Sequence, residues 1–135
     1  AVEIAKTKVA KRALLLPVSA PFHCSLMQPA ADAMAAALAE VTVNAPVVPL
    51  VANVLALPIS DPDDIRQRLV EQVTGVVRWT ESVTWLTGTG GVTHLAELGT
   101  GKVLTGLAKR INAEAVATAI STPADIDAFV AELSA

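Results

Sequence analysis

His23 is the residue of this sequence whose type and surroundings best suit acid–base chemistry. An apolar run ends at Pro17, and a second proline, Pro21, biases Ala20 toward extended backbone just before the histidine. A long alanine-rich segment, typical of a helix, starts directly after it. Imidazole exchanges protons readily near neutral pH, so a histidine held at such a strand-to-helix corner is suited to act as a general acid or base. A purely structural histidine remains the alternative at this point.

No residue of the chain has the sequence surroundings of a nucleophile that would partner this histidine. The G-x-S-x-G motif of the serine nucleophile elbow is absent, and none of the serines is flanked by glycines. Cys24 follows His23, but side chains of sequence neighbours seldom point at each other. We therefore expect Cys24 to be a small buried apolar residue. A complete serine-based site cannot be built from these residues.

The other candidates for chemistry have simpler structural interpretations. A zinc site made of His23, Cys24 and His94 would lack a second thiolate and a ligand-spacing pattern, so we expect no metal site. His94 falls in an expected strand and is interpreted as a strand-face or core residue. The acidic cluster at 61–64 fits the start of a helix better than a calcium loop, whose glycine and closing glutamate are missing.

The Gly-Thr-Gly-Lys segment at 99–102 precedes an expected helix and has two interpretations. A tight strand-to-helix turn is the simpler one, because the glycine spacing and the Lys-Ser/Thr pair of a P-loop are absent. In the alternative, its backbone N–H groups and Lys102 approach an anionic group. Lys102, Lys109 and Arg110 share this expected helix, and they form either an ordinary solvated face or a surface that docks an acidic partner.

Composition and charge exclude several kinds of partner. The net charge of −3 and the aromatic content of 3% provide neither a basic surface nor stacking platforms, so we expect no nucleic-acid partner. The longest apolar region, 41–59, contains asparagines and prolines, which argues against a membrane span and favours buried strand with turns. The single cysteine, Cys24, excludes an internal disulfide and fits the reducing cytoplasm.

The pattern of apolar and polar residues predicts strands that alternate with helices, which indicates an α/β layer architecture. Asp61 and Pro62 are typical of a helix start, and Thr122 and Asp125 form the pattern of a capping box. Thr80 is expected to cap a further helix. The expected helices are 2–10, 25–40, 62–73, 79–87, 102–111 and 123–133, and the expected strands are 13–18, 47–51 (extended by 54–57), 92–98 and 115–120.

Four ordered segments resemble those of the malonyl-CoA:acyl carrier protein transacylases. They are a histidine segment with LPVSAPFHCSLM, a strand segment around NAP and VANV, a glutamine segment with LVEQ and VRWTESV, and a C-terminal signature with ELGTGKVLTGL and KRI. Thr100 stands where proline is common in the family, and we expect only a local loop effect. By this resemblance, residues 13–135 are the C-terminal part of an α/β-hydrolase-like parallel-sheet core. Residues 1–12 would be the last helix of a small ferredoxin-like subdomain.

The resemblance implies transfer of malonyl from coenzyme A to the phosphopantetheine thiol of acyl carrier protein through a malonyl-serine intermediate, in fatty acid biosynthesis. His23 would be the general base and then the general acid. Gln72 would offer its backbone carbonyl to the imidazole Nδ1–H, so we expect little effect from Gln72→Ala. Phe22 would favour malonyl by crowding the α-methyl branch of methylmalonyl. No cofactor is expected beyond the substrates malonyl-CoA and phosphopantetheinylated acyl carrier protein.

The same resemblance predicts that this chain is one part of an enzyme. It opens at Ala1 without methionine, and the nucleophile elbow, an oxyanion-hole glutamine and a malonyl-binding arginine belong to the family's upstream portion. We expect the missing upstream half of the same enzyme as a partner, and no turnover by this chain alone. Two alternatives stay open: the acyltransferase domain of a polyketide or multifunctional fatty acid synthase, and a non-catalytic fragment that binds coenzyme A or carrier protein.

Overall fold

The structure is a computed structural model that describes residues 2–8, 10, 12–15 and 17–134. It contains both helices and strands, as expected for an α/β protein, but they alternate strictly only from residue 79 on. In chain order they are α1 (Val2–Thr7), the 3₁₀ turn η1 (Ser25–Met27), α2 (Gln28–Ala39), β1 (Leu50–Ala52), β2 (Leu57–Ile59), α3 (Pro62–Thr74), α4 (Trp79–Thr87), β3 (His94–Leu98), α5 (Val103–Ile111), β4 (Val116–Ile120) and α6 (Pro123–Leu133).

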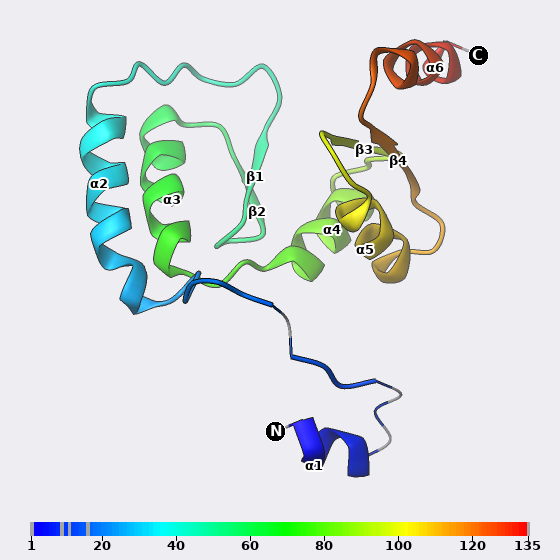
Figure 1. Cartoon of the computed structure of the whole chain (residues 1–135). Coiled ribbons are helices and arrows are strands. Elements are labelled where there is room, and N and C mark those ends of the chain that lie inside the picture. Colours follow the sequence, from blue (N-terminus) through cyan, green and yellow to red (C-terminus); the bar gives the residue numbers. More distant parts are fainter. Residues whose placement is uncertain (1, 9, 11, 16, 135) are drawn as a thin grey trace.

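Two groups of elements lie on either side of the link between α3 and α4 (Figure 1). In the first group, α2 and α3 lie side by side and β1 pairs with β2 next to α3. The second group contains α4, β3, α5, β4 and α6, and α1 lies apart from both groups. Within the described ranges, no helix is long and apolar enough to cross a bilayer.

Local capping explains where two of the helices begin. The side chain of Asp61 accepts hydrogen bonds from the N–H groups of Asp63 and Asp64, at 3.0 and 2.9 Å, and so satisfies two otherwise unpaired donors of α3. Thr122 and Asp125 form the predicted capping box at the start of α6. The predicted cap at Thr80 is wrong, because α4 already begins at Trp79 and has no side-chain cap.

The second group contains the parallel pairing that the sequence predicts. β3 and β4 run parallel, with Leu95 opposite Ala117, and α4 and α5 pack against this pair. Val83 of α4, Ala108 of α5 and Ala117 of β4 are buried against one another. Small side chains at two of these three positions allow the helices to approach the sheet closely.

The first group differs from the predicted parallel core. The chain turns at residues 53–56 instead of continuing as a strand, and β2 returns antiparallel to β1. The turn is fixed because the N–H groups of Leu55 and Ala56 both donate to the carbonyl of Ala52, and Ala56 adopts a positive φ of 55°. The expected extension of the strand through 54–57 is therefore wrong.

The predicted strand at 13–18 is also wrong for the residues that the structure describes. Residues 13–15, 17 and 18 have no strand structure, and Leu16 lies outside the described residues. A strand buried on both faces needs ladder partners on its two sides. Leu15 is 87% exposed, so the apolar run has no sheet to enter among the described residues.

Two glycines should respond oppositely to replacement by alanine. A Cβ at Gly75, just after α3, would lie 2.9 Å from the carbonyl oxygen of Glu71 and 3.0 Å from Val54. Gly75→Ala should therefore lower the free energy of unfolding by about 1–3 kcal/mol, because backbone must shift. Gly106 in α5 has open space around its Cβ position, and Gly106→Ala should raise the free energy of unfolding by about 0.5–1 kcal/mol.

Urea unfolding of both variants beside the unchanged chain measures this difference. The two substitutions add the same methyl group, so each is the matched control for the other. A rise in the free energy of unfolding of Gly75→Ala would contradict the close packing of Gly75 against α3 and Val54, and a fall in that of Gly106→Ala would contradict the open space at Gly106.

Candidate active site

His23 occupies a tight turn between Pro21 and η1. The N–H of Phe22 donates to the carbonyl of Ala20 at 2.9 Å, and His23 itself has a φ of 57°. A positive φ is uncommon for a residue that carries a Cβ, and such residues cluster at functional sites. The expected helix follows, as η1 and then α2, but the described residues before the turn form no strand.

The imidazole of His23 meets the backbone of α3. Its Nδ1 lies 2.8 Å from the carbonyl oxygen of Gln72, a residue 49 positions further along the chain. Gln72 belongs to the last turn of α3, whose carbonyl groups lack donors from within the helix. A histidine that donates Nδ1–H to this oxygen keeps the lone pair of Nε2 available to accept a proton.

The side chain of Gln72 is held from the β1–β2 turn. The amide Nδ2 of Asn53 donates to Oε1 of Gln72 at 2.8 Å, and both groups are partly buried. The carbonyl of Asn53 accepts from the N–H of Arg78 at 2.9 Å, and Nη1 of Arg78 donates to the carbonyl of Leu55 at 3.0 Å. The turn is thereby tied to Arg78, in the link between α3 and α4 that follows the helix end carrying Gln72.

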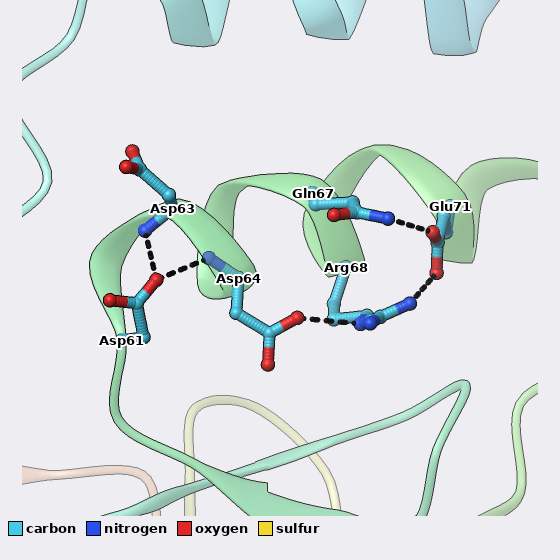
Figure 2. A network of polar contacts seen from close by, with 6 residues as sticks. All are labelled: Asp61, Asp63, Asp64, Gln67, Arg68 and Glu71. Carbon is cyan, nitrogen blue, oxygen red and sulfur yellow. Dashed lines mark hydrogen bonds and ion pairs between the residues drawn. The ribbon is translucent and has the colours of Figure 1, made fainter.

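A network of partly buried polar contacts runs along α3 and ends at the residue before Gln72 (Figure 2). Arg68 bridges Asp64, at 2.9 Å, and Glu71, at 2.6 Å. Gln67 also donates to Glu71, at 2.8 Å. Hydrogen bonds from Arg68 and Gln67 lower the pKa of Glu71, so its carboxylate stays ionised and the contacts persist across the neutral range.

The two neighbours of His23 have different surroundings. Phe22 is 55% exposed, so its ring is available at the surface beside the histidine. Cys24 is half-buried, and its Sγ–H donates to the carbonyl of Pro21 at 3.1 Å. The thiol therefore helps to close the turn, and the expectation of a small buried apolar Cys24 is wrong.

The glycine segment at 99–102 is a strand-to-helix turn. Gly99 and Gly101 have φ values of 126° and 114°, which explains why glycines occur there. At the start of α5, the N–H groups of Leu104 and Thr105 donate to the carboxylate of Glu97, at 3.1 and 2.8 Å. Hydrogen bonds from Thr105 lower the pKa of Glu97, which supplies the anion for these donors. This arrangement argues against the phosphate-binding alternative.

The second histidine and the acidic cluster have the structural roles that the sequence predicts. His94 lies on the exposed face of β3, where its Nδ1 is 2.9 Å from Oγ1 of Thr93. The acidic cluster at 61–64 caps and charges the start of α3. In the described part of the chain, no group of three or more His, Cys, Asp or Glu residues comes together as a metal site would require.

The sequence analysis missed the contribution of Asn53 and Arg78. In the sequence both residues stand only within segments of the family resemblance, Asn53 in VANV and Arg78 in VRWTESV. Their contacts join the β1–β2 turn to α3 and its link, across 19 residues in the case of Asn53 and Gln72. No local pattern reports a contact over such a distance.

The curated proteins that are similar to this chain in sequence share one name. The chain is 52% identical over 118 residues to "Malonyl CoA-acyl carrier protein transacylase" of Escherichia coli strain K12. This match covers 87% of this chain and 38% of the relative. The protein of the same name from Bacillus subtilis strain 168 is 40% identical over 131 residues, or 97% of this chain and 41% of the relative. No protein-family model matches the chain.

Solved structures agree with this result. An acyl-carrier-protein S-malonyltransferase from Bartonella henselae superposes with a TM-score of 0.88 at 54% identity, and the match covers 99% of this chain and 42% of that one. A malonyl-transacylase solved in complex with a type II polyketide synthase acyl-carrier protein superposes with a TM-score of 0.85 at 42% identity, over 96% of this chain and 42% of that one.

These relatives are all acyltransferases, and the fold and sequence place the chain in that class. More narrowly, the chain belongs to the malonyl CoA-acyl carrier protein transacylase family. It spans about two fifths of the length of the relatives it matches, and it corresponds to the C-terminal portion of their structures.

Proposed function

We propose that this chain supplies the catalytic histidine of an enzyme that transfers malonyl from coenzyme A to the phosphopantetheine thiol of acyl carrier protein. The observation that carries the proposal is the contact of 2.8 Å between Nδ1 of His23 and the carbonyl of Gln72. It orients the imidazole as the third member of a catalytic triad does. The reaction serves fatty acid biosynthesis in the cytoplasm, and neither half of it draws on a cofactor beyond the two substrates.

The reaction proceeds through a malonyl-serine ester. Nε2 of His23 accepts the proton of the serine hydroxyl while the serine oxygen attacks the thioester carbonyl. The carbon–sulfur bond then breaks, and the imidazolium returns its proton to the sulfur of coenzyme A. The phosphopantetheine thiol attacks the serine ester by the reverse sequence, and the serine hydroxyl regains its proton through His23.

The serine comes from an upstream portion of the same enzyme that packs on this chain. This part of the proposal is supported by large apolar side chains at the surface. Leu15, Val47 and Leu98 are 87%, 103% and 77% exposed. Extensive exposed apolar surface marks an interaction site. A hollow of about 220 Å³ between α4, β3 and α5 is lined by Trp79 and Leu104. Nε1 of Trp79 is buried there without a partner among the described residues.

A second setting for the same reaction is a polyketide synthase. One similar structure is a malonyl-transacylase bound to a type II polyketide synthase carrier protein, at 42% identity. An assay with a fatty-acid carrier protein and a polyketide carrier protein separates the two settings, because the physiological carrier should have the higher kcat/KM. We expect the fatty-acid carrier to be preferred.

Reconstitution tests the proposal. This chain is produced together with the upstream portion of the Escherichia coli relative, incubated with malonyl-CoA and analysed by denaturing mass spectrometry. A malonyl adduct on the upstream portion that forms only when this chain is present, and that is discharged by acyl carrier protein, is the expected result. Adduct formation and discharge at the same rate without this chain would refute the proposal, and the chain alone should show neither.

Phe22→Ser should relax the choice of acyl group in the reconstituted enzyme. The exposed ring beside His23 crowds an α-methyl branch, and loss of such contacts in a pocket changes selectivity by about tenfold or more. The measurement is the ratio of kcat/KM for malonyl-CoA to that for methylmalonyl-CoA. Phe22→Leu, which keeps a bulky apolar side chain, is the control, and an unchanged ratio in Phe22→Ser would exclude the ring from acyl selection.

A further inference from the structure

We propose that Asn53 is a positioning residue for the catalytic base, acting through the side chain of Gln72 and held in place by Arg78. The inference rests on the proposed function, because it concerns how the histidine of that reaction is aimed. Asn53 touches neither the histidine nor the reacting atoms. It acts on the residue whose backbone carbonyl receives the imidazole Nδ1.

The carbonyl of Gln72 needs such support because of its place in α3. It lies in the last turn, two residues before the end of the helix at Thr74, and helix ends fray. The hydrogen bond from Nδ2 of Asn53 to Oε1 of Gln72, at 2.8 Å and partly buried, fixes this residue from outside the helix. Displacing the carbonyl by a fraction of an ångström would turn the imidazole that points at it.

Asn53 is itself held at a second point. Its carbonyl accepts from the N–H of Arg78 at 2.9 Å, and the guanidinium of Arg78 donates to the carbonyl of Leu55 at 3.0 Å in the same turn. Nε of Arg78 also binds Glu81 in α4 at 3.0 Å. Val54 packs at the Cβ position of Gly75, three residues after Gln72.

These contacts form a closed ring. The chain connects Gln72 to Arg78, one hydrogen bond joins the N–H of Arg78 to the carbonyl of Asn53, and a second joins the side chain of Asn53 to that of Gln72. The imidazole of His23 contacts the backbone carbonyl of Gln72, outside this ring. A ring of covalent and hydrogen bonds removes the freedom of the helix end, which is what a base that must be aimed at a hydroxyl requires. The sequence predicts little effect of Gln72→Ala because it does not reveal the hydrogen bond from Asn53 to the Gln72 side chain. With this bond, we expect removal of the side-chain amide to slow the reaction.

Two substitutions remove the same hydrogen bond from its opposite ends. In the reconstituted enzyme, Asn53→Ala and Gln72→Met should each slow acylation by malonyl-CoA by about fivefold, and the double variant should be no slower than either one. Asn44→Ala is the matched control, since Asn44 is an exposed asparagine upstream of the same hairpin. Circular dichroism confirms that each variant is folded.

A spectroscopic measurement separates positioning from a loss of stability. With ¹⁵N-labelled histidine in this chain, only His23 and His94 contribute signals, and His23→Ala assigns them. We expect the Nδ1–H tautomer of His23 to lose population in Asn53→Ala and in Gln72→Met while His94 is unchanged. Gln72→Met keeps the test open if Asn53→Ala does not fold.

The outcomes distinguish this inference from the proposed function. If His23→Ala retains full acylation, the proposed function fails. If His23→Ala abolishes acylation while Asn53→Ala and Gln72→Met match Asn44→Ala in both rate and tautomer, the proposed function stands and the positioning role of Asn53 is overturned. Slower acylation with an unchanged tautomer also overturns it, because Asn53 would then be merely structural.

Discussion

Replacing His23 by alanine should lower kcat of the reconstituted enzyme by about 10²- to 10⁴-fold, the usual contribution of a positioned acid–base group. In the proposed reaction the imidazole accepts the proton of the serine and donates a proton to the departing thiol, so both halves of that reaction would lose their catalyst. Rapid-quench measurement of the malonyl adduct should show that acylation and its discharge slow together.

His94→Ala is the matched control for this substitution. Both residues are exposed histidines of the same chain. His94 lies on β3, and its ring forms a hydrogen bond with the side chain of the neighbouring Thr93 and not with the backbone of α3. We expect its kcat to equal that of the unchanged chain. Equal losses in the two variants would indicate a general effect of removing an imidazole and would exclude His23 as the base.

Val83→Asp should produce the largest loss of stability. Val83 is 1% exposed and packs against Ala108 and Ala117, and the partly buried side chains packed against this cluster include Trp79, Leu95 and Ile111. A carboxylate placed there must lose its water without gaining a partner, or bind a proton, so the free energy of unfolding should fall by about 3 kcal/mol or more. This is a large share of the stability of a domain of this size.

Val76→Asp provides the comparison, since Val76 is 72% exposed in the link between α3 and α4. The same change of side chain at this position should shift the free energy of unfolding by no more than about 0.5 kcal/mol. Urea unfolding followed by tryptophan fluorescence measures both variants, because Trp79 packs against Val83. Similar midpoints for the two would mean that Val83 is not in a packed core.

The sequence by itself determined the features that depend on a few neighbouring residues. The start of α3 at Asp61 and Pro62, and the capping box of Thr122 and Asp125, follow from side chains that bond to backbone groups within one turn. The sequence likewise predicts strands at 92–98 and 115–120, because their apolar pattern and the helix between them are typical of such a unit, and the structure has parallel strands at 94–98 and 116–120. Family and enzyme class followed from ordered motifs.

Only the tertiary structure decided how distant segments meet. The residues 13–18 have the pattern of a buried strand, but pattern alone does not provide ladder partners, and none is present among the described residues. The return of β2 against β1 depended on the carbonyl of Ala52 and on a positive φ at Ala56. Periodicity reports which residues are apolar and not where the chain reverses.

The candidate site shows the same division. The residues alone pointed to His23, through its type and its two prolines, and the resemblance named Gln72 and Phe22. The positive φ of His23 and the bond from Asn53 to Gln72 came only from the folded chain. A hydrogen bond between side chains 19 residues apart depends on where a turn and a helix end come together, and that is set by packing and not by local sequence.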